Sequence, residues 1–477
     1  MIRDLLIKSS LKDQIIAWRA MAAAGVAAFD NAESGNIAKA TARGWTREDY
    51  ATLLAVVDKA DAELQVLERE QPKVVVPADD SPGAYIGSAP TLSMLQTIIN
   101  GANEQAGLVE QAIGQGLATD QNGLSDQFLS DVAQPKEGLG FFYSAFDEPG
   151  LFYATEWVKA MAYRVFHAAH PFVVAGPTST LAKKARLIIV GDWGTGVGRA
   201  LDVANQMRLA LDEKPDWERH VVHLGDIYFC GWPDEVKERF QDPWPVKAGE
   251  AGIRSWSLNG NHDMYAGGDG YFGMLAKDPR FAGQGGASYF SLGNEYWHIL
   301  GLDSAYEEWS LTGNQVAWAQ AERAKFPTAR GILLSHHQPF SAYEGNEPGK
   351  AGNLSNAAAP LLKDGFTTLW LWGHEHRCVV YEPRQLNFDD GSQGHLPFGA
   401  CLGHGGVPTQ PTREKKAQVK YLLDKEVTRG GEKFGMMGFA ILDLDGPVAT
   451  FTCVDENGNR GVFIDENGKP SGFTETF

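Results

Sequence analysis

Residues 187–198 read LIIVGDWGTGVG, an apolar run followed at once by a turn that contains four glycines. This pattern is typical of a buried strand that leads into a helix. Such turns often bind phosphate, but Arg199 stands where a G-x-G-x-x-G motif needs its third glycine, and no Walker lysine follows. We therefore reject a nucleotide-binding loop, and Asp192, the carboxylate at the end of the strand, becomes the residue to explain.

Downstream of this turn, short apolar runs alternate with amphipathic stretches. The pattern predicts an α/β fold in which helices connect the strands of a sheet. Residues 287–304 predict a hairpin around Gly293 and Asn294. The stretch from 438 to 470 contains two turn signals between alternating apolar residues, and it predicts additional antiparallel strands.

The first 170 or so residues have a helical character instead. Apolar residues recur at helical spacing within 46–71, and Thr46 and Asp49 resemble a capping box at its start. Two more helices are predicted over about 92–117 and over 151–170. Residues 1–180 are therefore expected to form a helical N-terminal region, with a lid, an oligomerisation module or a protein contact as its candidate roles.

Composition limits the partners of the protein. The 477 residues carry a formal net charge of −18, which disfavours nucleic acid as a partner because such binding relies on basic contacts to phosphates. No apolar run is long enough to span a bilayer, and the first residues lack the apolar block of a secretory signal. We expect a cytoplasmic protein without a membrane partner.

The four cysteines are far apart in the sequence and form no CxxC pair, so they predict neither a disulfide framework nor a thiolate zinc site. Isolated, buried, reduced thiols are expected at Cys230, Cys378, Cys401 and Cys453.

Polar residues of a particular kind follow five apolar runs. Ligands of open α/β folds bind at the carboxyl edge of the sheet, so these side chains are expected to meet there. Oxygen and imidazole donors without thiolate suit Zn, Mn or Fe, and one aspartate can bridge two ions. The residues concerned are Asp192, Asp226, Asn261, His262, Asp263, His336, His337, His374 and His376.

Five motifs in this order, GDWG, GDIYF, GNHD, SHH and GHEH, resemble the signature of the calcineurin-like metallophosphoesterases. The first motif is closer to the purple-acid-phosphatase-like branch than to the branch with a DxH motif. The resemblance covers roughly residues 186–455. It implies a four-layer α/β/β/α sandwich with two metal ions at one edge, formed by a domain over 181–477 that includes the C-terminal strands.

The resemblance also implies roles for individual residues. Asp192 and His376 would bind the first metal, and Asp226 would bridge both ions. Asn261, His374 and one histidine of the SHH motif would bind the second metal; His336 is the expected ligand and His337 the alternative. His262 would act as general acid or transition-state stabiliser, with its orientation held by Asp263.

The sequence departs from the family pattern at the first metal. The DxH branch has a histidine two residues after the first aspartate, where this chain has Gly194. Purple acid phosphatases have a tyrosine three residues after the bridging aspartate, where this chain has Phe229. Tyr228 is one residue too early, and because consecutive strand residues point to opposite faces, it can replace the missing ligand only if the chain bulges. Packing or substrate contact by Tyr228 is the other interpretation.

The resemblance implies hydrolysis of a small phosphomonoester or phosphodiester by in-line attack of a metal-bound hydroxide. The expected cofactors are two divalent or trivalent ions of Fe, Mn or Zn, and the expected partner is a small phosphorylated substrate. His404, between glycines in CLGHGG, is a candidate substrate contact, with a tight turn as the alternative. The alternative function is a non-catalytic scaffold with the same fold that binds protein partners.

Overall fold

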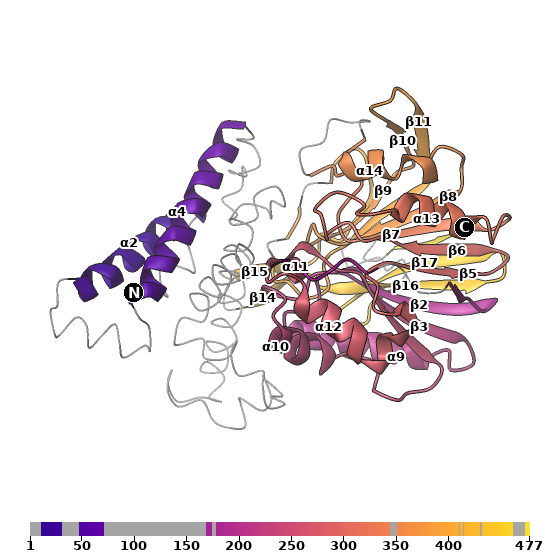
Figure 1. The fold of residues 1–477 in the computed structure, drawn as a ribbon, viewed down its shortest axis with the longest axis horizontal. Helices are drawn as coiled ribbons and strands as arrows, with labels where there is room; N and C mark the ends of the chain where they lie inside the picture. Colours follow the sequence, from indigo (N-terminus) through magenta and orange to yellow (C-terminus); the bar gives the residue numbers. More distant parts are fainter. Residues whose placement is uncertain are drawn as a thin grey trace. The chain divides into compact units, whose positions relative to one another are not determined.

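A computed structural model describes residues 11–30, 47–70, 168–173, 178–343, 351–409, 411–413, 415–429, 432–460 and 473–477. The chain divides into two compact units. The first includes helices α2 (Leu11–Asp30) and α4 (Arg47–Glu70) and the hairpin of β14 (Glu426–Arg429) and β15 (Glu432–Gly435). The second begins at Phe166 and contains two large sheets (Figure 1).

In the first unit, α2 and α4 pack against each other. Leu53, Val57 and Leu64 are buried on α4 because they recur at helical spacing on one face. Arg19 of α2 forms ion pairs with Asp58 and with Asp61 of α4. Helix α4 confirms the helix predicted over 46–71. The helices predicted over 92–117 and 151–170 lie outside the described residues, apart from 168–170, which are not helical.

None of the helices in the described ranges is both long and apolar enough to cross a membrane.

The first large sheet contains the strand that precedes Asp192. Its order is β18-β17-β16-β2-β3-β4, with β2, β3 and β4 parallel and β16 antiparallel to β2. Both faces of β2 are buried, as expected for a parallel strand between two layers. The strands are β2 (Lys184–Val190), β3 (Glu218–His223), β4 (Ile253–Ser257), β16 (Gly438–Asp445), β17 (Val448–Asp455) and β18 (Thr474–Thr476).

The second large sheet has the order β1-β5-β6-β7-β8-β12-β9-β13. Strands β5 and β6 are antiparallel and form the predicted hairpin, with Asn294 in its turn. The strands are β1 (Ser179–Thr180), β5 (Phe290–Gly293), β6 (Trp297–Gly301), β7 (Arg330–Ser335), β8 (Thr367–Trp372), β9 (Cys378–Tyr381), β12 (Phe398–Leu402) and β13 (Val419–Leu422). A separate hairpin joins β10 (Arg384–Asn387) and β11 (Gln393–Leu396).

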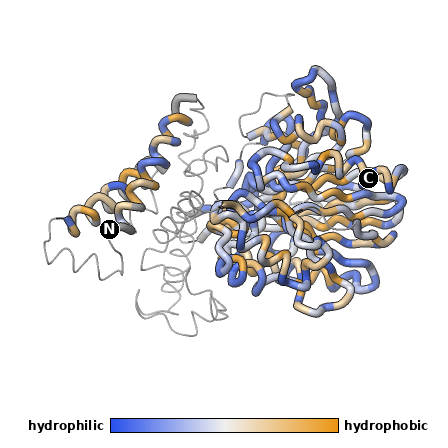
Figure 2. The backbone as a smooth tube through the Cα atoms, viewed as in Figure 1, coloured by the Kyte–Doolittle hydropathy of each residue, from blue (hydrophilic) through white to orange (hydrophobic). Residues whose placement is uncertain are grey.

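The two sheets face each other across one apolar core. Leu187 and Ile189 of β2 share this core with Ile332 and Leu334 of β7. Figure 2 shows the apolar backbone segments concentrated in the strands between the outer layers. Helices cover the outer faces, which gives four layers and confirms the predicted α/β/β/α sandwich.

The helices of the second unit also have defined bounds. Those beside the first sheet are α9 (Gly198–Asp212), α10 (Pro233–Glu235), η2 (Val236–Gln241), α12 (Asp269–Lys277) and η3 (Pro279–Gln284). Those beside the second are α13 (Gln315–Arg323), α14 (Asn353–Ala357) and η4 (Ala359–Leu361), and the short α11 (Asn261–Tyr265) follows β4.

The glycine-rich turn after β2 is a junction between the sheets. Gly191 donates its N–H to the carbonyl of Leu402, at the end of β12, over 3.2 Å. A Cβ on Gly191 would lie 3.1 Å from the Cα of Gly373, a close contact that a side chain could make only if the backbone at this junction shifted. Arg199, at the start of α9, is held in a buried ion pair with Glu456. The turn therefore serves close packing, in agreement with our rejection of a phosphate loop.

All four cysteines are buried and free, as expected. They are not all isolated, however. The Sγ atoms of Cys378 on β9 and Cys453 on β17 lie 3.6 Å apart, because these strands belong to facing sheets that share one core.

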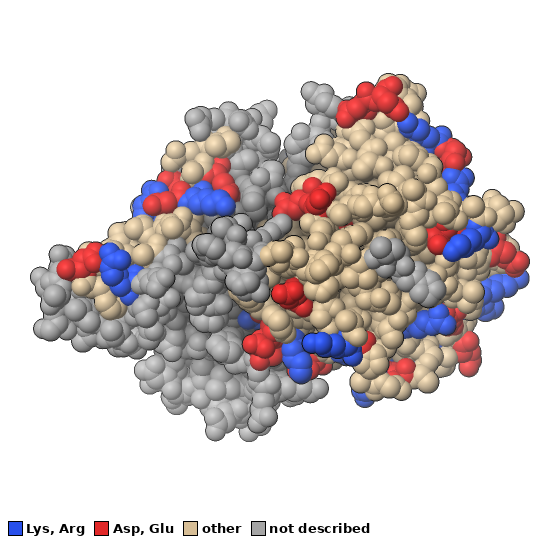
Figure 3. Space-filling model, in the orientation of Figure 1, with Lys and Arg blue, Asp and Glu red and all other residues tan. Residues whose placement is uncertain are grey.

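Charged side chains of both signs lie next to one another over the visible face of the molecule (Figure 3). The ion pairs of the second unit include Arg208 with Glu250 and Lys363 with Asp390. A solvent-exposed pair such as Lys363 with Asp390 contributes little to stability, about 0–1 kcal/mol.

Candidate metal centre

The backbone at the strand ends has an unusual conformation. Among the described residues, five that are not glycine have a positive φ, and four of these are expected ligands: Asp192 (56°), Asp226 (71°), His374 (69°) and His376 (44°). At positive φ the Cβ atom lies too close to the backbone, which costs about 1–3 kcal/mol per residue. Strain that collects in four residues at one edge of the fold indicates a functional centre.

The first group of donors surrounds the hydroxyl of Tyr228. This oxygen lies 3.0 Å from Oδ1 of Asp192, 3.1 Å from Oδ2 of Asp226 and 2.7 Å from Nε2 of His376. The same nitrogen of His376 lies 3.3 Å from Oδ1 of Asp192. The structure thus brings Tyr228 together with both expected ligands of the first metal and with the bridging aspartate.

Tyr228 reaches this place because the chain turns directly after Ile227. Ile227 forms an isolated bridge to Gly194, Tyr228 donates its N–H to the carbonyl of Gly194, and residues 228–230 form a turn. The alternation of side chains along a strand therefore does not apply to Tyr228. A Cβ on Gly194 would lie 3.0 Å from the Cα of Ile227, which leaves little room for a histidine there.

The second group of donors meets at Nε2 of His336. This nitrogen lies 3.0 Å from Oδ1 of Asn261, 3.2 Å from Nδ1 of His374 and 3.4 Å from Oδ1 of Asp226. The amide of Asn261 donates to the hydroxyl of Tyr265 over 2.8 Å, which leaves its oxygen directed to the group. Asp226 therefore contacts both groups, one with each carboxylate oxygen.

Of the two adjacent histidines, His336 makes the closer contacts. Its Nδ1 lies 3.0 Å from the carbonyl of Leu224. A carbonyl only accepts, so Nδ1 carries the hydrogen and Nε2 keeps a lone pair for a ligand. The Nδ1 of His337 lies 3.2 Å from Oγ of Ser304. One ring nitrogen of His337 lies within 4.8 Å of a ring nitrogen of His336 and of one of His374.

The charges of these groups suit a cation. Burial and repulsion from Asp226 raise the pKa of Asp192 well above its usual range. Burial disfavours the charge of Asp226, but attraction to His336 and to His262 outweighs it and lowers the pKa of Asp226 to about 2. Burial lowers the pKa values of His336, His374 and His376, which favours the neutral form of these imidazoles. Buried carboxylate oxygens and neutral imidazoles are a donor set that fits divalent transition metals.

His262 lies beside the first group. Its backbone N–H donates to Oδ1 of Asp226 over 2.9 Å, and its ring packs on that of Tyr228 with centroids 4.5 Å apart. The N–H contact requires glycine before Asn261, since a Cβ on Gly260 would lie 2.0 Å from the same Asp226 oxygen. The Nδ1 of His262 lies 2.7 Å from the carbonyl of Phe229, which orients the ring.

Asp263 does not orient His262, contrary to expectation. Its carboxylate accepts the backbone N–H groups of Gly260, Asp226 and Ile227 over 2.6, 3.0 and 3.1 Å. Neighbouring residues on helix α11 point in different directions, so Asp263 faces the backbone while His262 faces the centre. Asp263 instead ties the turn after β3 to the start of α11.

His404 is buried on the loop after β12. Its Nε2 would lie 2.9 Å from a Cβ on Gly438, and its ring is a neighbour of Cys378 in the core between the sheets. Substrate contact by His404 stays a prediction.

Three neighbours of the centre were missed in the sequence. Tyr265 lies four residues after Asn261 on α11, a helical spacing that could have indicated the contact. Buried Glu375, between two ligands, accepts Nε1–H of Trp372 over 3.1 Å and also binds the hydroxyl of Ser341. Trp309 packs its ring on His337 and His374, and no local pattern predicts this.

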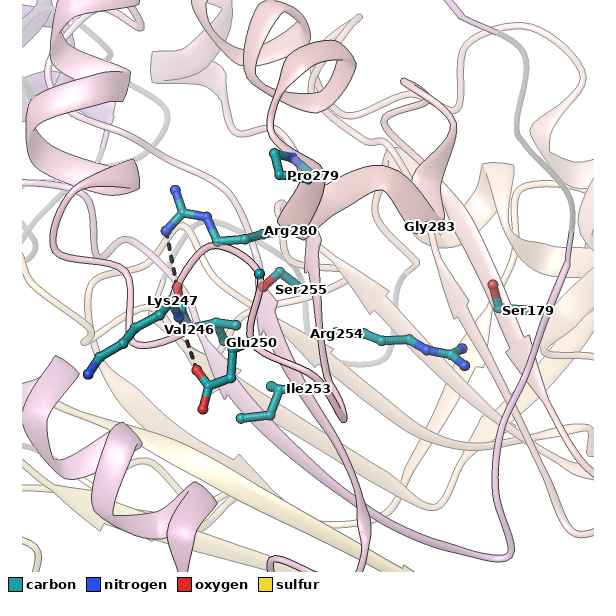
Figure 4. A pocket seen from close by; sticks show the side chains of 11 residues that line it. Ser179, Val246, Lys247, Glu250, Ile253, Arg254, Ser255, Pro279, Arg280 and Gly283 are labelled. Carbon is teal, nitrogen blue, oxygen red and sulfur yellow. Dashed lines mark hydrogen bonds between the residues drawn. The ribbon is translucent and has the colours of Figure 1, made fainter.

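A pocket of about 440 Å³ lies elsewhere, at the amino end of β4 (Figure 4). Its charged groups are largely engaged: Arg280 binds Asp278 and the carbonyl of Val246, and Glu250 binds Arg208. Asn261 follows the other end of β4, so this pocket is not part of the metal centre.

Part of the chain is similar to a known protein family. Residues 185–378 match the family model described as calcineurin-like phosphoesterase. One similar solved structure, "GAP50 the anchor in the inner membrane complex of Plasmodium", is 14% identical, with a TM-score of 0.41 over 61% of this chain and 88% of that chain. Another, "Structure of PhoD", is 10% identical, with a TM-score of 0.37 over 64% and 70% of the two chains. The search of curated proteins found no match.

Proposed function

We propose that this chain, whose residues 185–378 match the calcineurin-like phosphoesterase family model, hydrolyses small phosphate esters with the help of two metal ions. The observation that carries the proposal is the position of Asp226. Its Oδ2 lies 3.1 Å from the Tyr228 hydroxyl in the first group, and its Oδ1 lies 3.4 Å from Nε2 of His336 in the second. A carboxylate shared by two donor groups is the arrangement that a dinuclear centre needs.

The donors divide between the two ions as follows. Asp192, Tyr228 and His376 would hold the first ion, Asn261, His336 and His374 would hold the second, and Asp226 would contact both. Fe, Mn and Zn suit these oxygen and imidazole donors. When bound, a pair of such ions activates water near neutral pH and neutralises charge that develops on a phosphoryl group.

His262 is the proton donor in this proposal. The carbonyl of Phe229 requires a hydrogen on Nδ1, so Nε2 is the atom that takes up and releases a proton. A proton released from Nε2 to the departing oxygen avoids an alkoxide as leaving group. The backbone N–H of His262 remains on Asp226 and keeps the ring beside the centre.

The proposal is tested on the purified full chain by elemental analysis and a panel of phosphomonoesters and phosphodiesters. We expect about two transition-metal ions per chain, and hydrolysis that is lost on chelation and restored by Mn, Zn or Fe. Metal removal should abolish activity because the ions contribute several kcal/mol to transition-state stabilisation. A metal content near zero, with no hydrolysis of any ester in added metal, would favour the non-catalytic scaffold instead.

Substitution of Tyr228 tests whether its hydroxyl contributes to binding of the first ion. In Tyr228→Phe we expect binding of one of the two ions to weaken by about 10–100-fold, because a group that contacts three expected ligands is removed. Metal titration of the apoprotein measures this change. Tyr271→Phe is the matched control, since this buried hydroxyl donates to the carbonyl of Ser257 over 2.6 Å. Equal affinity for both ions in Tyr228→Phe and the wild type would leave Tyr228 as a hydrogen-bond partner only.

The cytoplasmic location, the lack of a nucleic acid or membrane partner and the roles of residues 1–180 stay predictions from the sequence.

A further inference from the structure

Trp309 is the fifth non-glycine residue with a positive φ among the described residues, at 63°. It follows β6 in sequence, and its N–H donates to the carbonyl of Ser304 over 3.0 Å. A bulky side chain is a true outlier in this region of φ. Strain of this kind persists only where the surrounding structure holds it, and it collects at functional sites. The other four such residues are the expected metal ligands, and the ring of Trp309 packs on one of them, His374.

The indole ring of Trp309 forms a wall of the second donor group. Its centroid lies 4.5 Å from that of His337, at an interplanar angle of 45°, and 5.3 Å from that of His374, at 89°. The side chain is only partly buried, unlike the fully buried tryptophans of this chain, which include Trp193, Trp256, Trp297, Trp370 and Trp372. The ring therefore contacts the donor histidines and still has surface that a ligand can reach.

The chemistry of the ring and its neighbours limits what it can bind. An indole face presents a flat π surface, which prefers to stack on another aromatic ring. The preceding residues Glu307 and Glu308 are exposed carboxylates and disfavour an anionic group beside the ring. The substrate phosphate belongs with the metal ligands, so the part of a substrate next to Trp309 is the uncharged part.

On the basis of the proposed phosphoesterase function, we propose that Trp309 forms a subsite beside the second donor group that stacks on a flat, uncharged aromatic group of the substrate. The preferred substrates are then aryl or uncharged heteroaromatic esters of phosphate, in preference to alkyl esters. Stacking on an aromatic side chain changes binding by about 10–100-fold per ring, so the subsite is large enough to determine specificity.

Competitive inhibition by two phosphonates tests this subsite. Phosphonates have no ester bond to hydrolyse, so the measurement reports binding alone. Phenylphosphonate and methylphosphonate carry the same anionic group, and only the first has a ring. For the metal-loaded wild type we expect phenylphosphonate to bind at least about tenfold more tightly. Trp309→Leu should remove most of this preference, whereas Trp309→Phe, which keeps an aromatic face, should retain most of it.

Two further measurements separate recognition from damage to the centre. Trp309→Leu should keep the wild-type metal content and its affinity for methylphosphonate. Trp318→Leu is the matched control, because Trp318 is also partly buried but packs on Tyr289, and it should leave the preference unchanged.

The outcomes distinguish this inference from the function on which it rests. A wild type that hydrolyses esters but binds both phosphonates equally overturns the subsite alone. The subsite is also overturned if Trp309→Leu weakens the binding of both phosphonates to the same extent or lowers the metal content. In either case Trp309 only supports the histidines. A metal-loaded wild type that neither hydrolyses an ester nor binds either phosphonate overturns the proposed function and the subsite together.

Discussion

Asp226→Ala is expected to lower kcat/KM for phosphate ester hydrolysis by about 10³-fold or more. The substitution removes a carboxylate whose two oxygens each contact one donor group, so the chain loses the side chain expected to bridge the two ions. Two-metal stabilisation contributes several kcal/mol, and each 1.4 kcal/mol or so is tenfold in rate. Elemental analysis of the same sample should show fewer than two ions per chain.

Two further variants distinguish loss of the metal centre from unfolding of the protein. Asp226→Asn keeps an oxygen that can accept the N–H of His262, and it should retain the wild-type melting temperature while activity remains low. Asp443→Asn is the matched control, because Asp443 pairs with Arg186 near the amino end of β2, away from the ligands. Wild-type activity and metal content in folded Asp226→Ala would contradict the dinuclear centre.

His262→Ala is expected to lower kcat by about 10²–10⁴-fold with the metal content unchanged. This is the usual contribution of a positioned proton donor. The loss should depend on the leaving group: it should be largest for alkyl esters, whose alkoxides need a proton, and smallest for p-nitrophenyl esters. The measurement is therefore the slope of log kcat against the pKa of the leaving alcohol, in the wild type and in the variant.

A buried histidine outside the centre serves as the control for His262. His298 lies on β6, and its ring forms a hydrogen bond with Oγ of Ser291 on β5. His298→Asn should therefore leave the slope unchanged. If His262→Ala lowers all rates equally, His262 stabilises the centre but does not deliver the proton.

Much of the centre could be predicted because its signals are local. An apolar run followed by glycine and a polar residue marks the end of a buried strand, and Asp192, Asp226, Asn261 and His374 follow such runs, while His336 follows an apolar run and Ser335. The structure brings these five together. Two details could not be read locally. The position of the Tyr228 hydroxyl depends on a turn that begins directly after Ile227. The family resemblance implies that Asp263 orients His262, but its carboxylate accepts backbone N–H groups of distant residues instead.

The type and order of the candidate donors could be predicted from local sequence: carboxylate, amide and imidazole groups that follow strands. Periodicity and residue type carry that information, because both act over a few neighbouring residues. That the donors come from two sheets follows from the tertiary packing, which puts Asp192 and Asp226 after strands of one sheet and His336 and His374 after strands of the other. The contact of Asp192 with the backbone of His374 joins residues 182 positions apart. Such a contact forms because the sheets bury their apolar faces against each other, and no local pattern encodes that distance.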